Sequence, residues 1–189
     1  MMLEGQKVKL REFRREDAAA IREWVNNENI NRYLGFWIAP QSAEETQAYL
    51  ERQLIRQNPP SSVELVIALK DDPELRYIGG IGLHAIDYRN RNCELGIVIG
   101  REDLLGRGLG ADAILTLLDY AFGFLNLHRV GLTHWDHNER GHRCYLKCGF
   151  KEEGRLREKR FYDGRYWDVV VMGITEGDYR ANRAQRAAL

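Results

Sequence analysis

The sequence predicts one α/β domain built on a mixed sheet, antiparallel in its first part and with a parallel crossover later. Three observations predict this class. A strand-like run is followed by two helical segments, three further strand-like runs succeed one another between turn signals, and a long amphipathic helix leads into a short strand. With 189 residues, 44% hydrophobic and 30% charged, the chain is long enough for one core of ordinary composition.

The N-terminal elements follow from periodicity and capping. Residues 8–13 alternate apolar and polar side chains, which is typical of a strand. The Ala-rich segment after Asp17 places apolar side chains at helical spacing. A capping box at 42–45 predicts a second helix that runs to about Asn58, where two prolines stop it. We expect residues 30–40 between these helices to be irregular.

The rest of the chain alternates strands with two helices. Turn signals near 71–73 and 87–90 indicate an antiparallel meander, and Asp163-Gly164 indicates a hairpin. No linker divides the chain, so we expect one domain over residues 1–175 and a polar tail over 176–189 that frays. We expect about seven strands and about four helices. The strands are placed at 8–13, 63–69, 77–86, 93–99, 130–133, 150–161 and 166–174, and the last two helices follow the glycines at 106–110 and span 139–148.

Composition excludes several classes of function. The 28 basic residues balance the 28 acidic ones, so no overall field attracts nucleic acid or an anionic membrane, and no apolar run is long enough to span a bilayer. Three cysteines, with no signal peptide, indicate free thiols and predict a cytoplasmic protein. Cys144 and Cys148 lie near three histidines, but we interpret them as apolar core residues and expect no metal site.

Glycines cluster in the segment 106–110 (Gly-Arg-Gly-Leu-Gly), between a strand and a helix. Glycine allows a tight turn and the close approach of an anion, and the unpaired first amides of a helix favour negative charge. The segment is therefore suited to a pyrophosphate, although a plain turn explains the glycines equally well. It matches neither G-x-G-x-x-G nor the P-loop, because no Lys-Ser or Lys-Thr follows.

The glycine segment and a second motif together resemble the GNAT superfamily of N-acetyltransferases. The family's loop pattern is Arg/Gln-x-x-Gly-x-Gly/Ala, and its downstream pattern, roughly Asn-x-x-Ala-x-x-x-Tyr-x-x-x-Gly-Phe, resembles residues 138–150. Similar segments along nearly the whole chain make the ribosomal-protein alanine N-acetyltransferases the branch that it resembles most. Three positions depart from the patterns: Leu105 replaces Arg or Gln, Asp112 replaces a common Glu, and Gly141 replaces Ala. The resemblance implies the GNAT fold and acetyl-coenzyme A as the acetyl donor.

By this resemblance, the donor binds where the sheet splays. The strand that ends at Ile99 separates from the strand at 130–133, and the pantetheine arm pairs with its exposed edge. The pyrophosphate rests on backbone amides at the start of the following helix, and Asn138 contacts the pantetheine arm. The implied donor-binding residues are Ile97, Val98, Ile99, Arg107, Gly108, Leu109, Gly110, Ala111 and Asn138.

The chemistry requires a proton donor for the departing thiolate and a base for the amine. Tyr145 matches the family's proton-donating tyrosine, and a phenol with a pKa of about 10 suits that role. A tyrosine that only packs its ring is the alternative. Glu94 at the start of a strand is the leading candidate for the base, and His134 is the second. Glu94 could equally be a solvated carboxylate, and His134 a packed ring.

The acceptor is less well defined. Tyr33, Phe36 and Trp37 lie in a region that is an acceptor-side loop in the family, and they either line the acceptor pocket or form core for the first helices. Residues 22–56 contain four Arg and five Glu, which argues mildly against a polyamine acceptor.

We therefore predict an N-acetyltransferase that transfers acetyl directly, in a ternary complex, to a primary amine. The expected acceptor is an α-amino group of a protein N-terminus or of an amino-acid-like compound. Small amines such as polyamines, aminoglycosides or amino acids are the alternative. An acyl-coenzyme A sensor without activity and a nucleotide-binding module are alternatives of other classes, disfavoured by Tyr145 and by the missing Lys-Ser/Thr. The family contains monomers and dimers, so a homodimer stays open.

Overall fold

Eight strands and six α-helices make up the part of the chain that the structure describes. The structure is a computed structural model, and it describes residues 2–34, 39–55 and 60–187. The strands are β1 (Leu3–Glu4), β2 (Val8–Arg11), β3 (Val63–Leu69), β4 (Gly79–Asp87), β5 (Asn92–Ile99), β6 (Arg129–Trp135), β7 (Lys151–Tyr162) and β8 (Arg165–Thr175). The helices are α1 (Ala18–Val25), α2 (Glu28–Asn31), α3 (Ala43–Leu54), α4 (Leu109–Gly123), α5 (Glu139–Cys148) and α6 (Glu176–Ala187), with 3-10 turns at Arg15–Asp17 and Glu102–Leu104.

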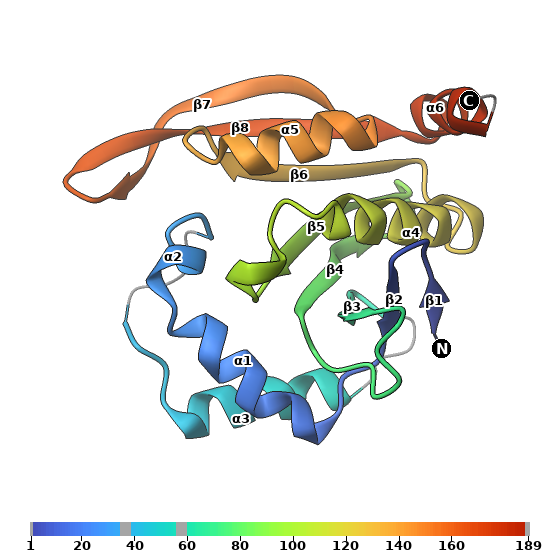
Figure 1. Cartoon of the computed structure of the whole chain (residues 1–189). Coiled ribbons are helices and arrows are strands. Elements are labelled where there is room, and N and C mark those ends of the chain that lie inside the picture. The colour runs from blue at the N-terminus through green and yellow to red at the C-terminus, as the bar shows by residue number, and fades with distance from the viewer. Residues whose placement is uncertain (1, 35–38, 56–59, 188–189) are drawn as a thin grey trace.

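The strands form one sheet in the order β1-β2-β3-β4-β5-β6-β8-β7. Neighbouring strands run antiparallel except β5 and β6, which run parallel. Helix α4 forms the crossover between these two strands (Figure 1). The mixed α/β class, antiparallel first and parallel later, is confirmed.

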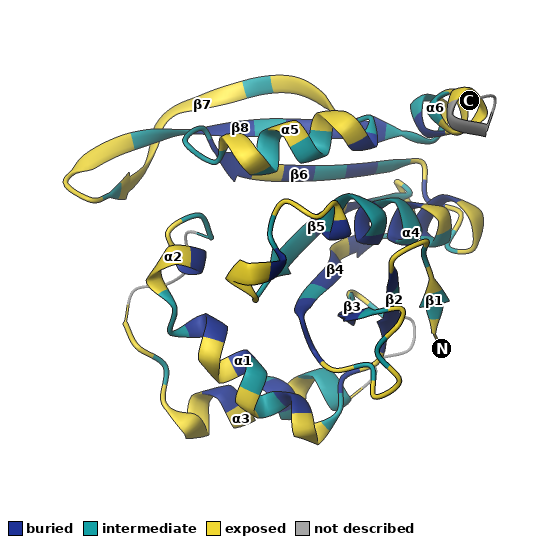
Figure 2. Ribbon diagram, in the orientation of Figure 1, coloured by how far each residue is buried: buried dark blue, intermediate teal, exposed yellow. Residues whose placement is uncertain are grey.

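Two apolar layers hold helices against opposite faces of the sheet (Figure 1). Helix α4 packs on one face, and α1 and α3 cover the other with a smaller cluster. Alternate residues of β3 show the division, because Leu65 and Ile67 belong to the first cluster and Val66 to the second. Figure 2 shows that β7, at one edge of the sheet, is exposed along most of its length.

Some element boundaries differ from those predicted. The bounds of β3 and α5 agree with the sequence analysis. The prediction that the helix after Ser42 runs to about Asn58 is wrong, because Ile55 is extended (φ −94°, ψ 115°) and α3 ends at Leu54. Residues 56–58 lie outside the described residues. Neither β1 nor α2 was predicted, since elements of two and four residues are too short to show a period.

The segment expected to be a fraying polar tail forms helix α6 from residue 176. Tyr179 is 4% exposed, and its ring lies 5.2 Å from the ring of Phe122 in α4. Lys151 and Asp178 add an ion pair at 2.5 Å between β7 and α6. One buried aromatic ring therefore docks a segment whose composition gave no sign of order.

The parallel pairing of β5 with β6 is short. Its register pairs are Asn92 with Arg129, Cys93 with Val130, and Glu94 with Gly131. Beyond that point, β5 continues to Ile99 alongside β4, and β6 continues to Trp135 alongside β8. The two strands therefore splay, as the family resemblance implies.

A buried ion pair fixes the first helix to the sheet. The Arg11 guanidinium donates to both carboxylate oxygens of Asp17, at 2.6 and 2.9 Å, and both side chains are 2% exposed. Arg11 also donates to the carbonyl oxygens of Glu12 and Leu75, and Asp17 accepts the Arg14 amide. Removal of one partner would leave the other charge buried and uncompensated.

We expect Asp17→Ala to lower the free energy of unfolding by about 3–5 kcal/mol, the usual cost of an orphaned buried charge. Urea unfolding followed by tryptophan fluorescence measures it. Asp119→Ala is the matched control, because Asp119 pairs with Arg183 at 3.0 Å on the surface and such pairs contribute little. Equal unfolding free energies for the two variants would contradict this account of the pair.

Candidate active site

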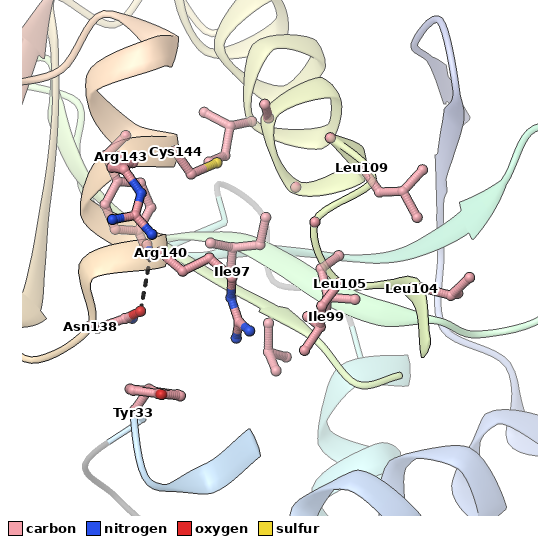
Figure 3. A pocket seen from close by; sticks show the side chains of 18 of the residues that line it. Tyr33, Ile97, Ile99, Leu104, Leu105, Leu109, Asn138, Arg140, Arg143 and Cys144 are labelled. Atoms are coloured by element: carbon pink, nitrogen blue, oxygen red, sulfur yellow. Dashed lines mark hydrogen bonds between the residues drawn. The ribbon is translucent and has the colours of Figure 1, made fainter. Parts of the chain in front are cut away.

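Two cavities, each of about 310 Å³, meet at the splay between β5 and β6. The first, the α4 cavity, lies between β5, the start of α4 and α5 (Figure 3). The second, the β4 cavity, lies over β4 and β5 and reaches the aromatic side chains of α1 and α3. The residues that line both are Tyr33, Leu34, Ile97, Val98, Asn138 and Tyr145.

Helix α4 begins at the wall of the α4 cavity. Gly106 and Gly108 have φ of +76° and +79°, in the left-handed region that glycine adopts without strain, and Gly108 is the N-cap. The Asp112 amide donates to the Gly108 carbonyl at 3.1 Å, so the amides of residues 109–111 precede the first helical hydrogen bond. These three residues line the cavity, which therefore receives the positive end of the helix dipole.

Three cationic side chains of α5 line the same cavity. Arg140, Arg143 and Lys147 are spaced by three and four residues, which places them on one side of the helix. Among the described residues, no carboxylate lines the α4 cavity. Figure 3 shows Arg140 extending into the cavity beside Asn138. The cavity therefore suits a ligand with an apolar arm and a polyphosphate end. The sequence analysis missed these cations, although their spacing is readable in the sequence.

A carboxylate in the first turn of α4 ties the helix to the edge of the sheet. Asp112 accepts hydrogen bonds from the backbone amides of Gln6, Lys7 and Val8, at 3.1, 2.7 and 3.0 Å. Gly5 leaves room for this carboxylate, since a Cβ there would lie 2.5 Å from an Asp112 carboxylate oxygen. The Asp that departs from the family pattern thus fixes the orientation of the α4 N-terminus.

Asn138 caps α5 at the junction of the two cavities. Its side-chain oxygen accepts the Gly141 amide at 3.0 Å, which satisfies one free donor of the helix. A Cβ at residue 141 would lie 2.7 Å from the Asn138 side-chain nitrogen, so glycine there leaves room for the cap. The cap holds Asn138 where the donor's arm is expected.

Tyr145 lies on α5 and faces both cavities. Its ring centroid lies 5.6 Å from that of His134 and 6.3 Å from that of Phe150. None of the described residues forms a hydrogen bond with its hydroxyl. Burial raises the pKa of Tyr145 above its ordinary value of 10.0, so the hydroxyl stays protonated at neutral pH. It therefore has a proton to give.

His134 is 5% exposed, and both of its ring nitrogens have partners. Nδ1 lies 2.8 Å from the carbonyl oxygen of Trp135, and Nε2 lies 3.0 Å from Nδ1 of His142. Burial lowers the pKa of His134, which favours the neutral ring. In that form Nδ1–H donates to the carbonyl and Nε2 accepts from His142. A ring bound in this way is poorly placed to take a proton from an amine.

Two further predicted residues lie outside the cavities. Glu94 is exposed at the last β5–β6 register pair, and it is not among the described residues that line either cavity. Arg107 is also exposed and does not line the α4 cavity, although its carbonyl accepts the Lys7 ammonium at 3.0 Å. The other predicted donor-binding residues line the α4 cavity: Ile97, Val98, Ile99, Gly108, Leu109, Gly110, Ala111 and Asn138.

Of the three aromatic residues predicted on the acceptor side, the structure describes Tyr33. Its ring lies 5.4 Å from the His137 ring and 5.7 Å from the guanidinium carbon of Arg140. Tyr33 lines both cavities, which is consistent with an acceptor-side position. Phe36 and Trp37 lie outside the described residues, so their placement stays a prediction.

The β4 cavity contains a paired carboxylate and imidazole that the sequence analysis missed. Nδ1 of His84 in β4 lies 2.8 Å from a carboxylate oxygen of Glu64 in β3. Aromatic side chains of Trp24, Tyr49 and Tyr77 form part of the wall. In the sequence, both Glu64 and His84 have apolar neighbours on either side. An isolated polar residue in an apolar strand is the signal that could have indicated them.

Several known proteins are similar to this chain in sequence and in structure. The family model described as the acetyltransferase (GNAT) domain matches residues 7–151. The spermidine N(1)-acetyltransferase of Vibrio cholerae is 33% identical over 177 residues, which cover 93% of this chain and 96% of that protein. Its crystal structure with CoA and spermine superimposes with a TM-score of 0.79 at 32% identity, covering 92% of this chain and 98% of that one. YdaF of Bacillus subtilis, assigned provisionally as a ribosomal N-acetyltransferase, is 27% identical over 95% of this chain and 97% of its own.

Neither a membrane span nor a metal centre is found in the described part of the chain. No helix there is long and apolar enough to cross a membrane. No group of three or more His, Cys, Asp or Glu residues there is arranged to hold a metal ion.

The Gly110 position tests where the donor lies. A Cβ at residue 110 would meet no atom closer than 3.9 Å, so Gly110→Ala should be accommodated. In Gly110→Leu, the larger side chain fills the space beside Cys144 and Ile97. We expect calorimetric titration with acetyl-coenzyme A to give at least about tenfold weaker binding for Gly110→Leu, a loss of about 1.4 kcal/mol, and near-normal binding for Gly110→Ala. Equal affinities for the two variants would place the donor elsewhere.

Proposed function

Because the chain belongs to the GNAT family of acetyltransferases, we propose that it acetylates a primary amine of a small molecule, with polyamines as the leading acceptor class. The observation that carries this proposal is the β4 cavity, which is lined by a carboxylate and aromatic side chains and joins the donor side at the splay. The relative given above with the higher sequence identity, a spermidine N(1)-acetyltransferase, supports the same class.

The lining of the β4 cavity suits an ammonium group. Glu64 supplies a carboxylate that is 17% exposed, and Trp24, Tyr49 and Tyr77 supply aromatic rings of the kind that attract cations. Arg160 from β7 is the one arginine among the described lining residues. The balance of Arg and Glu over residues 22–56 had argued against a polyamine. That argument fails, because the carboxylate that lines this cavity belongs to Glu64 in β3, outside residues 22–56.

The α-amino acceptor that we expected from the sequence receives less support. The protein assigned provisionally to ribosomal acetylation is 27% identical to this chain, against 33% for the spermidine acetyltransferase. A cavity of about 310 Å³ also limits how much of a folded substrate can enter. A small amine is therefore the better proposal.

Transfer in this arrangement is direct. The amine nitrogen attacks the thioester carbonyl at the splay, the carbon–sulfur bond breaks, and the amide retains the acetyl group. The amides of residues 109–111 and the cations of α5 hold the phosphates, and Ile97, Val98 and Ile99 pair with the pantetheine arm. Tyr145 supplies the proton that the departing sulfur takes.

An acceptor screen tests the proposal. We expect acetyl-coenzyme A to be consumed with spermidine or spermine far faster than with alanine-terminated peptides, measured by release of free thiol. Tyr145→Phe is the control for catalysis, because it keeps the ring and removes the proton. It should lower kcat by about 10²–10³ with little change in KM for acetyl-coenzyme A.

A preference for N-terminal peptides over polyamines would overturn the proposed acceptor. Equal turnover by wild type and Tyr145→Phe would remove the proposed proton donor. Binding of acetyl-coenzyme A without turnover of any amine would favour a sensor.

A further inference from the structure

The Glu64–His84 pair is built into the floor of the β4 cavity. Glu64 lies opposite Gly82 in the β3–β4 register, and His84 lies opposite Glu94 in the β4–β5 register. Successive positions of β4 alternate in direction, so Gly80, Gly82 and His84 share one face. Nδ1 of His84 lies 2.8 Å from the carboxylate of Glu64, with exposed fractions of 48% and 17% for the two side chains.

Two glycines give the pair its position. A Cβ at Gly82 would overlap the Glu64 carboxylate, so this residue leaves the space that the carboxylate fills. A Cβ at Gly96 would lie 2.8 Å from Nε2 of His84, so the imidazole lies directly over this residue of β5. The pair therefore extends across three strands, with one ring nitrogen held by Glu64 and the other over β5.

This position is beside the expected point of reaction. Gly96 immediately precedes Ile97, which lines both cavities at the splay. Tyr145 lines the β4 cavity as well, and it supplies the proton for the leaving group in the proposed function. The two predicted candidates for the base are less suited. Glu94 does not line the cavity, and both ring nitrogens of His134 have partners.

We propose that His84 is the base that takes the proton from the acceptor amine, and that Glu64 is its positioning residue. The proposal rests on the proposed function. Nδ1–H donates to Glu64, which fixes the tautomer and leaves Nε2, the nitrogen over Gly96, to accept a proton. As the amine nitrogen bonds to the carbonyl carbon and the carbon–sulfur bond breaks, the amine proton passes to Nε2 and the sulfur takes the Tyr145 proton. The half-exposed imidazolium then returns its proton to water, and the Tyr145 phenolate takes a proton back from water, so that both residues are restored.

The surrounding charges make His84 a stronger base. The hydrogen bond to Glu64 raises the pKa of His84 above its ordinary 6.5, and the charge of Glu94 adds to the effect, although burial opposes it. Tyr49 of α3 stays neutral because burial raises its pKa to about 12. Other titratable or charged groups that line the cavity are Tyr33, Tyr77, His134, Tyr145 and Arg160. Since the base must be neutral, kcat should fall as the pH drops through the raised pKa of His84.

Two variants test the proposal in the full-length protein with spermidine as acceptor. His84→Asn keeps a side-chain N–H that can reach Glu64 but removes Nε2, and we expect kcat to fall by about 10²–10³ with KM for acetyl-coenzyme A nearly unchanged. Glu64→Gln retains an oxygen that can accept Nδ1–H but removes the charge. The acid limb of the kcat–pH profile should then move to lower pH, an effect that a purely structural residue would not produce. His128→Asn is the matched control, because His128 is exposed just before β6 and its replacement should leave kcat unchanged.

Three outcomes would overturn the proposal: a kcat of His84→Asn within about threefold of wild type, an acid limb that Glu64→Gln leaves in place, or a raised KM for the amine at unchanged kcat. The last would assign His84 to acceptor binding. An NMR titration of the His84 ring needs no acceptor. Its pKa should fall in Glu64→Gln, and an unchanged pKa would refute the pair. If wild type acetylates another amine and not spermidine, the proposed acceptor fails, and the same variants measured with that amine still decide the role of His84.

Discussion

The parallel pairing of β5 and β6 stops after Glu94 and Gly131, and the positions of both cavities follow from that stop. Each strand remains hydrogen-bonded on its other side, to β4 and to β8, so the sheet continues while its centre opens. The facing edge of β5 beyond Glu94 then carries backbone groups that need partners from water or a ligand. A ligand arm that contains amides can supply those partners by adding to the strand edge.

The two cavities that meet at this opening differ in charge. On the α4 side, three cations and the start of a helix converge with no carboxylate among the described lining residues. On the β4 side, Glu64 holds His84 against the sheet, and aromatic rings form the walls. Under the proposed function, an anionic donor and a cationic acceptor approach the splay from opposite sides. Asp112 lies outside the α4 cavity but helps to position it. Its carboxylate accepts three backbone amides and so fixes the N-terminus of α4 to the β1–β2 turn.

Periodicity and motif spacing were enough to predict the sheet class, most elements and the glycine loop with its helix. They failed for α6, where a single buried ring, Tyr179, docks a polar segment, and for β1 and α2, which are too short to show a period. The Glu64–His84 pair was beyond sequence reasoning for another reason. The two residues lie on different strands, and their contact depends on the β3–β4 register and on the space left by Gly82 and Gly96. The three cations of α5, by contrast, were readable from their spacing and were overlooked.

In the proposed reaction, donor and acceptor meet at the splay, one from each cavity. A conjugate in which coenzyme A sulfur and a spermidine nitrogen are joined through an acetyl bridge tests this most directly, by calorimetric titration against coenzyme A alone. If the cavities join as described, the conjugate should bind at least about 100-fold more tightly, since the second binding event becomes intramolecular. An affinity equal to that of coenzyme A alone would show that the spermidine arm finds no site beyond the splay, and would contradict the account.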